Sequence, residues 1–270
     1  MRRTFAIGDI HGELDALLEL LQHIGPIGSD DTLVFLGDYV DRGPQSREVI
    51  DFIRFDLPHS GARIVPLRGN HEDAWLRVLT EGWDGFILPP SNGCVACYRS
   101  FVGGARDAPP ANDEEWEQLL SGSFFPDDVV EWLHELPLYF EDEHAIYVHA
   151  GLPKVDGRFL HPSEVEQTAS LLWTRTMDFF KNYRGKTCIV GHTVTSLLPR
   201  ELSSYTPEDP ADLWAGEQVI AIDTGCGKGG FLTAIEMPEL FVWESRVPRR
   251  HQDERAYERK ATPLAVPSQS

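Results

Sequence analysis

Seven aspartate, asparagine and histidine residues follow short apolar runs that resemble buried strands, and each lies at nearly the same offset from its run. They are Asp9, His11, Asp38, Asn70, His71, His149 and His192. A single histidine after a strand is usually a turn or core residue, but here the pattern recurs at five strand ends. In α/β sheets the carboxyl ends of parallel strands converge on one crevice, so we expect these side chains to share one site.

The donor atoms in this set define a class of metal ion. Three oxygen donors and three imidazoles are present, without a thiolate: Asp9, Asp38, Asn70, His11, His149 and His192. Such a set suits Mn, Fe, Co or Zn better than a soft metal or an all-oxygen calcium site. Six ligands exceed the four of a structural zinc site, so the economical interpretation is two divalent ions that share a bridging carboxylate.

The cysteines offer a weaker alternative. Of the four in the chain, only Cys94 and Cys97 form a C-x-x-C pair, and the irregular spacing of the set argues against a disulfide framework. No second C-x-x-C or C-x-x-H completes four zinc ligands. A zinc site or a redox pair at these two residues is therefore disfavoured.

The elements that must position the polar residues alternate between short apolar runs and helical patterns. The runs predict strands at 5–7, 32–36 and 62–67, and the patterns predict helices at 13–23, 46–53 and 72–79. This β-α-β-α-β order favours a right-handed, largely parallel sheet. Further strands are predicted at 145–148, 187–190 and 219–222, with two short runs near 232 and 241.

The middle of the chain and its end differ in composition from these elements. Residues 82–112 are rich in Gly and Pro, which predicts a long irregular excursion. Residues 107–143 contain twelve Asp or Glu and no Lys or Arg, with a helix predicted at 127–134. We expect one domain over 1–246, in which 82–143 forms a cap or groove wall. From about Val247 apolar patterning is lost, so 247–270 is expected to be a poorly ordered tail.

The charge and length of the chain exclude some classes of function. The 270 residues carry a formal net charge of −19, which argues against general affinity for nucleic acid or anionic membrane. A phosphate-bearing substrate must therefore be held locally, by metal ions or clustered arginines. No apolar window is long enough for a membrane span, and Asp9 interrupts any signal-like run at the amino terminus. We expect a soluble, cytoplasmic protein.

Five ordered blocks resemble the signature of the PPP-type serine/threonine phosphoprotein phosphatases, of bacterial type, within the calcineurin-like metallophosphoesterases. They are G-D-I-H-G (8–12), G-D-Y-V-D-R-G (37–43), R-G-N-H-E (68–72), V-H-A-G-L (148–152) and V-G-H-T (190–193). The first and second blocks are separated by 24 residues, and so are the second and third. The resemblance runs from Phe5 to about Glu236. L-L-W-T-R at 171–175 and I-D-T-G-C-G at 222–227 are similar to secondary blocks of the bacterial members. The resemblance implies an α/β fold whose central β-sandwich of mixed sheets is flanked by helices in four layers, α/β/β/α.

The resemblance also implies how the ligands divide between two ions. Asp9, His11 and Asp38 would hold one ion, and the second would be held by Asp38, Asn70, His149 and His192. Asp38 would then bridge the pair. Mn is the expected metal, with Fe, Co or Zn as alternatives. A water or hydroxide between the ions would be the nucleophile, because two nearby dications lower its pKa.

The remaining block residues receive roles in the same way. His71 would be the general acid that protonates the leaving oxygen, with Asp41 as its carboxylate partner. The residues expected to bind the non-bridging phosphate oxygens are Arg42, Arg68 and Arg175. As a structural alternative, Arg42 or Arg68 would simply pair with Asp41 or Glu72. Arg175, matched through a shorter motif, has a structural alternative as well.

The substrate is open between two classes. A phosphoserine or phosphothreonine protein or peptide is favoured, because Asp41 and Glu72 are both present and because the acidic region 82–143 suits a basic phosphopeptide. The alternative is a symmetrical dinucleoside polyphosphate hydrolase of the diadenosine tetraphosphate type. A remote alternative is a catalytically silent metal-binding scaffold, which the intact set of ligands disfavours.

Overall fold

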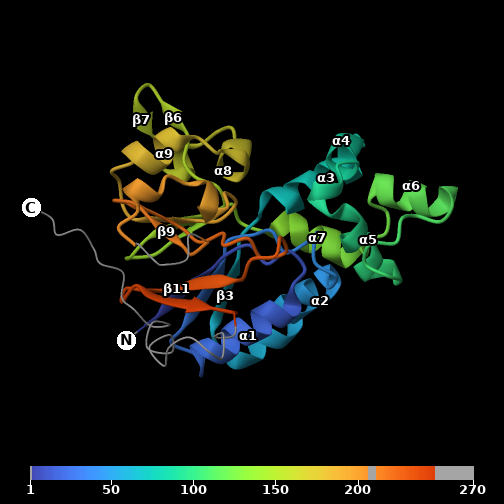
Figure 1. Ribbon diagram of the computed structural model, residues 1–270, viewed down its shortest axis with the longest axis horizontal. Coiled ribbons are helices and arrows are strands. Elements are labelled where there is room, and N and C mark those ends of the chain that lie inside the picture. The colour runs from blue at the N-terminus through green and yellow to red at the C-terminus, as the bar shows by residue number, and fades with distance from the viewer. Residues whose placement is uncertain (1, 206–210, 247–270) are drawn as a thin grey trace, which may run out of the picture.

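Two five-stranded sheets stack at the centre of the protein (Figure 1). The computed structural model describes residues 2–205 and 211–246, and the tail expected at 247–270 lies outside them. The strand order is β12-β11-β1-β2-β3 in the first sheet and β4-β5-β8-β10-β9 in the second. A short hairpin, β6 (Lys154–Val155) and β7 (Arg158–Phe159), stands apart from both.

The first sheet has a parallel core, as the alternating pattern of its sequence predicts. Its strands are β1 (Thr4–Ile7), β2 (Thr32–Phe35), β3 (Arg63–Pro66), β11 (Thr233–Met237) and β12 (Phe241–Glu244). β1, β2 and β3 run parallel, whereas β11 and β12 are antiparallel to their neighbours. The carboxyl ends of the three parallel strands therefore lie at one edge of the sheet.

The second sheet is built in the same way from the later part of the chain. Its strands are β4 (Tyr139–Glu141), β5 (Ile146–Val148), β8 (Cys188–Val190), β9 (Trp214–Ala215) and β10 (Val219–Ala221). β5, β8 and β10 are parallel, and β4 and β9 are antiparallel edge strands. The three parallel strands match the apolar runs predicted at 145–148, 187–190 and 219–222.

Side-chain alternation along the strands creates the layers. Phe5 and Ile7 of β1 pack in one cluster with Leu17 and Leu20 of the helix α1 (Leu14–Ile24), whereas Ala6 points to the opposite face. There the cluster also contains Val34, Tyr147 and Ile189, so it fills the space between the two sheets. A third cluster joins the outer face of the second sheet to α8 (Ala169–Trp173) and α9 (Met177–Asn182). The four-layer α/β/β/α arrangement is thereby confirmed.

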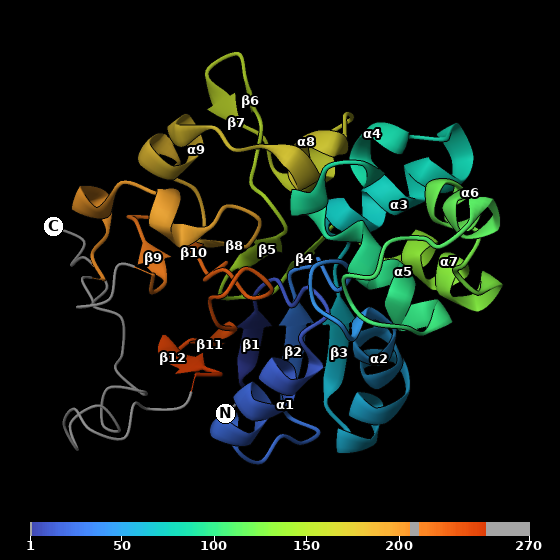
Figure 2. The same ribbon diagram turned by 45° about the vertical axis from the view of Figure 1, so that its right-hand side comes forward.

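A group of helices lies beside the β3 edge of the first sheet (Figure 2). It contains α3 (Asn70–Glu81), α4 (Asp84–Ile87), α5 (Cys94–Val102), α6 (Asp113–Ser121) and α7 (Asp127–Glu135). The expectation of an irregular excursion over 82–112 was wrong for α5, which is regular for nine residues. Glycines with positive φ, Gly93 and Gly103, bound this helix, so the composition of the whole window obscured a short regular element.

The shorter elements complete the chain. The helix α2 (Ser46–Asp51) continues into a π-helical turn at Phe52–Asp56. Short 3₁₀ turns occur at Leu57–Ser60, Pro90–Asn92, Pro162–Glu164, Thr195–Leu197 and Arg200–Leu202. In the part of the chain that the structure describes, no helix has the length and apolar character needed to cross a membrane.

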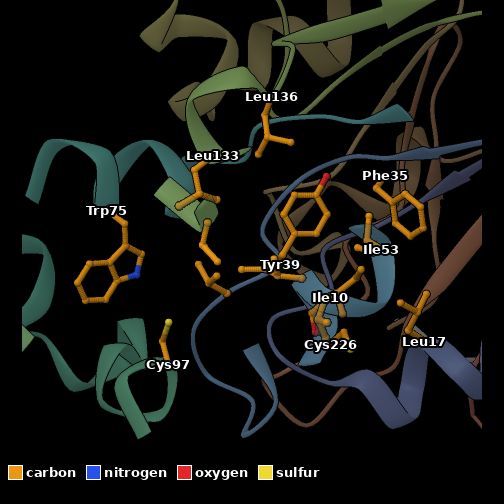
Figure 3. Packing of buried hydrophobic residues seen from close by; sticks show 14 of the residues in the cluster. Ile10, Leu17, Phe35, Tyr39, Ile53, Trp75, Cys97, Leu133, Leu136 and Cys226 are labelled. Carbon is orange, nitrogen blue, oxygen red and sulfur yellow. Dashed lines mark hydrogen bonds between the residues drawn. The ribbon is translucent and has the colours of Figure 1, made fainter. Parts of the chain in front are cut away.

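The turn after β2 packs into the largest apolar cluster. Figure 3 shows Tyr39 with Phe35 and Ile53 on one side and with Leu133 and Leu136, from the end of α7, on the other. The Tyr39 hydroxyl donates a hydrogen bond to the Leu67 carbonyl at 2.7 Å. The residue that follows Asp38 is therefore fixed in the core, which holds the strand end in place.

Candidate metal centre and active site

The ends of strands from both sheets deliver the predicted polar residues to one buried place. Asp9 and His11 follow β1, Asp38 follows β2, Asn70 and His71 begin α3 after β3, His149 follows β5, and His192 follows β8. Each of the seven side chains belongs to a residue that is less than one-tenth exposed. The structure thus brings together all six predicted metal ligands and the predicted general acid.

The backbone around these residues adopts rare conformations. Five non-glycine residues here have positive φ: His11, Asp38, Asp41, Arg42 and His192. Each such residue costs roughly 1–3 kcal/mol, and clusters of them occur where the surroundings hold side chains in a functional arrangement. A glycine also makes room, because a Cβ at Gly191 would collide with the carboxylate of Asp9.

Four donor atoms converge on the side of the second sheet. Asn70 Oδ1 lies 2.7 Å from His192 Nδ1 and 3.0 Å from His149 Nε2. His149 Nε2 is in turn 3.5 Å from Asp38 Oδ1. His149 Nδ1 faces the Leu36 carbonyl at 2.7 Å and must carry the ring proton, because that carbonyl can only accept. In the neutral imidazole, Nε2 is then an acceptor that faces another acceptor, Asn70 Oδ1. A cation between them resolves this conflict, so the donor set fits a metal ion.

A second group of donors lies on the side of the first sheet. His11 Nδ1 faces the Val40 carbonyl at 3.0 Å, which leaves Nε2 as the acceptor. That atom is 3.4 Å from Asp38 Oδ2 and 4.0 Å from Asp9 Oδ2. The amide of His192 donates to both oxygens of Asp9, at 3.0 and 3.1 Å, and orients the carboxylate. Asp38 therefore presents Oδ2 to this group and Oδ1 to the other, as a bridging ligand would.

Burial sets the charge of the ligands. Burial lowers the pKa of His149, and it lowers the pKa of His11 and of His192 well below the usual value, which favours the neutral imidazole that can bind a metal ion. Burial by itself would raise the pKa of Asp38, but His149, His71, His11 and Arg42 together hold it well below its usual value. The Asp38 carboxyl is thus ionised and able to bind two cations.

Asp9 behaves in the opposite way. Burial, followed by the nearby carboxylates of Asp223 and Asp38, raises the pKa of Asp9 well above its usual value. Without a metal ion, burial and the crowding of carboxyl groups therefore favour the protonated form of Asp9. Two buried clusters of His and Asp ligands, His11–Asp38–His71 and Asp38–His149–His192, are therefore consistent with a dimetal centre.

The predicted acid and its carboxylate partner are in contact. His71 Nδ1 lies 2.5 Å from Asp41 Oδ2, and the indole nitrogen of Trp75 donates to Asp41 Oδ1 at 3.0 Å. His71 Nε2 points to the metal ligands, 3.9 Å from Asp38 Oδ2. Asp41 is fully buried, so the pair is fixed from behind while Nε2 remains directed at the site.

The three predicted phosphate-binding arginines differ in position. The Arg42 guanidinium contacts Nε2 of His11 and lies 3.0 Å from Nε2 of His71, directly over the centre. Arg175 donates to the His192 carbonyl at 2.8 Å from the other side. Arg68 instead donates to the His134 carbonyl at 2.6 Å, at the end of α7. The structure brings Arg42 and Arg175 to the ligands and directs Arg68 away from them.

Two residues of the site have roles that were not predicted from the sequence. Glu72 accepts the amides of Asp38, Tyr39 and Gly69 at 2.8–2.9 Å and is fully buried, so it fixes the turn after β2 and does not face a substrate. Trp75 lies one helical turn after His71, which is a spacing that could have indicated its contact with the acid pair.

Asp223 and the C-x-x-C pair also lie close to the centre. Asp223 is buried, its Oδ1 accepts the amide of Gly225 at 3.0 Å, and its Oδ2 has no hydrogen-bond partner among the described residues. The block I-D-T-G-C-G was the available signal for it. Cys94 and Cys97 are buried beside Asp41, and burial followed by that carboxylate raises the pKa of both thiols.

Comparison with known proteins identifies similar chains. The sequence model of the family described as calcineurin-like phosphoesterase matches residues 2–196. An asymmetrical bis(5'-nucleosyl)-tetraphosphatase, PrpE, of Anoxybacillus flavithermus is 28% identical over 262 residues, which cover 87% of this chain and 90% of the relative. A symmetrical bis(5'-nucleosyl)-tetraphosphatase of Coxiella burnetii is 31% identical over 189 residues, which cover 68% of this chain and 54% of the relative.

Among solved structures, the fold matches a metallophosphoesterase from Sphaerobacter thermophilus. The TM-score is 0.51, the sequence identity is 18%, and the match covers 96% of this chain and 98% of the other. At this identity the likeness concerns the fold, including the two mixed sheets and their flanking helices.

Proposed function

The chain belongs to the calcineurin-like phosphoesterase family, and we propose that it hydrolyses bis(5'-nucleosyl) tetraphosphates at a centre of two divalent metal ions. The proposal of two metal ions is supported by the orientation of Asp38, whose two carboxylate oxygens face separate groups of buried donor atoms. The substrate is supported by the two tetraphosphatases to which the chain is similar.

The expected preference for phosphoserine or phosphothreonine has less support than its alternative. That preference rested partly on Glu72, whose carboxylate binds backbone amides in the interior and cannot contact a substrate. The acidity of residues 82–143 also favoured a phosphopeptide. That acidity affects the association of the protein with basic peptides and does not select the bond that is cleaved. The similarity to two tetraphosphatases supports the nucleotide substrate as the first of the two candidates.

The residues present fit two ions. Asp9, His11 and Asp38 would hold one, and Asp38, Asn70, His149 and His192 would hold the other. Mn is the metal that we propose, and Fe, Co and Zn suit the same donors. When bound, the two ions supply a water of lowered pKa as the nucleophile and polarise the phosphate.

The protein's own residues bind the phosphate and move the proton. Arg42, placed over His11 and His71, offers its guanidinium to the non-bridging oxygens, and Arg175 offers a second cation beside His192. Asp41 holds Nδ1 of His71 and so keeps Nε2 directed to the leaving oxygen, to which the imidazolium donates its proton. A phosphate role for Arg68 stays a prediction, because its guanidinium is bound to the His134 carbonyl.

One observation keeps a phosphomonoesterase as the second candidate. The His71–Asp41 pair, which would donate a proton to the leaving group, is complete. An alkoxide that leaves from phosphoserine or phosphothreonine is strongly basic and needs this proton. A leaving nucleotide needs it less, because its terminal phosphate has a pKa of about 6. Both substrate classes must therefore be measured on the same enzyme.

The test compares specificity constants under one concentration of Mn. We expect diadenosine tetraphosphate to have a higher kcat/KM than a phosphothreonine peptide, with products that show the mode of cleavage: ADP alone, or AMP with ATP. A preference of about a hundredfold for the peptide would overturn the proposal in favour of the second candidate. Absence of turnover with both substrates, in a protein that binds Mn, would favour the silent scaffold.

A further inference from the structure

A glycine-rich loop lies against the centre on the side of His11. The segment Gly225–Gly230, G-C-G-K-G-G, follows Asp223 in the connection from β10 to β11, above the carboxyl end of β1 (Figure 2). The Cys226 thiol contacts the Ile10 carbonyl at 3.3 Å. A Cβ at Gly227 would lie 2.6 Å from the Cβ of His11 and 3.3 Å from the Cβ of Arg42, so only glycine permits this approach.

The loop is a tight turn that is hydrogen-bonded within itself. Gly225, Gly227 and Gly229 have φ of 81°, 73° and 84°, and they alternate with Cys226 and Lys228, which have no positive φ. In an open loop such alternation turns successive amides toward one anion, but the amides of Gly225, Lys228 and Gly230 are engaged within the protein here. The loop is held in shape by Asp223, which accepts the Gly225 amide, and by the Gly225 carbonyl, which accepts the amides of Lys228 and Gly230.

Lys228 places a cation at the top of this loop. Its side chain is exposed and forms no ion pair with any residue in the described ranges 2–205 and 211–246. It acts on Asp9 as a nearby positive charge that opposes the rise in that residue's pKa. On a chain with a net charge of −19, this unpaired cation beside the centre is available to a phosphate group.

The proposed tetraphosphate substrate has phosphates that the centre alone does not bind. The two ions, Arg42 and Arg175 would account for the phosphate that reacts, and the acidic surface repels the rest of a polyphosphate chain. The Gly225–Gly230 loop adjoins Arg42 and His11 directly. We propose that Lys228, which this loop holds beside the centre, binds the phosphates of a dinucleoside polyphosphate that lie beyond the phosphate under attack. This inference rests on the proposed function.

The test separates recognition of a phosphate chain from chemistry at one phosphate. Lys228→Gln is compared with the wild type on diadenosine tetraphosphate and on p-nitrophenyl phosphate, which has a single phosphate. We expect kcat/KM for the tetraphosphate to fall about fivefold or more relative to that for p-nitrophenyl phosphate, as the loss of one charge-assisted contact requires. Lys228→Arg should retain most of the wild-type ratio, because it keeps the cation.

Lys181→Gln is the matched control. Lys181 is exposed on α9, outside the site, so this variant makes the same change of charge and should leave the ratio of the two specificity constants at the wild-type value. If Lys228→Gln lowers both specificity constants by the same factor, or changes the ratio no more than Lys181→Gln, the loop is not a phosphate site and the inference is wrong.

A second measurement is independent of the proposed function. Inorganic tripolyphosphate, at fixed free Mn, is used as a competitive inhibitor of p-nitrophenyl phosphate hydrolysis. If the wild type fails to cleave diadenosine tetraphosphate, the proposed function fails, but weaker inhibition of Lys228→Gln than of the wild type still supports the loop. Equal inhibition constants for the two proteins would overturn the loop even if the tetraphosphate is a good substrate.

Discussion

Nδ1 of His71 and Oδ2 of Asp41 lie 2.5 Å apart in a buried contact, with the other imidazole nitrogen directed to the metal ligands. The two residues come from different elements, the amino end of α3 and the turn after β2, and both positions are fixed by interior hydrogen bonds. His71 donates its amide to Asp38 Oδ1 at 3.0 Å, and Ser46 Oγ accepts the amide of Asp41 at 3.0 Å. The acid and the bridging ligand are thus oriented by the same short stretch of chain.

Replacing the carboxylate partner should weaken proton transfer. We expect Asp41→Asn to lower kcat by about a hundredfold on an alkyl phosphate monoester, because the amide no longer fixes the ring or stabilises its charge. The loss should be smaller on p-nitrophenyl phosphate, whose leaving group needs less protonation. Steady-state kinetics on both substrates check this. Asp84→Asn, at an exposed position on α4, is the control and should have no effect; equal losses on the two substrates would contradict the role of the pair.

Trp75 should act through Asp41. Trp75→Phe keeps a ring in the core but removes the N–H that donates to Asp41, at a cost of about 1–2 kcal/mol in unfolding free energy. We expect kcat to fall while KM stays near the wild-type value, because the substrate contacts are untouched. Urea unfolding and kinetics measure the two effects. Trp116→Phe, at an exposed position, should change neither, and an increase in KM without a loss of kcat would refute this assignment.

Glu72 should stabilise the turn that carries Asp38. In Glu72→Gln one carboxylate oxygen becomes an NH₂ group that faces backbone N–H donors, so we expect a loss of about 1–3 kcal/mol in the free energy of unfolding. Mn binding should weaken as well, because the bridging ligand is less well held. Denaturation with and without Mn measures both. Glu81→Gln, at an exposed position, is the control, and an unchanged midpoint for Glu72→Gln would show that the three amides do not depend on the carboxylate.

The stabilisation by Mn should increase with pH. Burial, then Asp223 and Asp38, raises the pKa of Asp9, so in the metal-free protein this carboxyl keeps its proton above the pH at which the unfolded chain loses it. That contribution to stability is present at low pH and is lost as pH rises through the raised pKa. Mn must displace the proton, so its binding strengthens over the same range. Melting temperatures with Mn and with a chelator, from mildly acidic to mildly alkaline pH, should diverge; a constant difference would contradict the assignment of Asp9 as a ligand.

The fold and the ligand positions could be predicted because their signals are local. Each ligand directly follows an apolar run or begins the next helix, and a strand end fixes the direction of a short side chain such as that of Asp38 or His149. The β-α-β order predicted a parallel sheet, and the four layers were implied by the family resemblance.

The rest of the site depends on contacts between remote segments. The long side chain of Arg68 binds a carbonyl 66 residues away, and no local pattern specifies that choice. Glu72 was interpreted as an indicator of the substrate class. In the structure its carboxylate instead accepts the amide of Asp38, 34 residues earlier in the chain. The helix α5 was not predicted because its short apolar pattern lies within a segment rich in Gly and Pro.

In the proposed mechanism, Asp38 would join two metal ions at the centre that cleaves the tetraphosphate. The direct measurement is metal content and turnover of diadenosine tetraphosphate on the same samples of wild type and Asp38→Asn. We expect two Mn per wild-type chain, and for Asp38→Asn a loss of at least one ion with a fall in kcat of at least about a hundredfold. An Asp38→Asn protein that keeps two ions and wild-type turnover would contradict it.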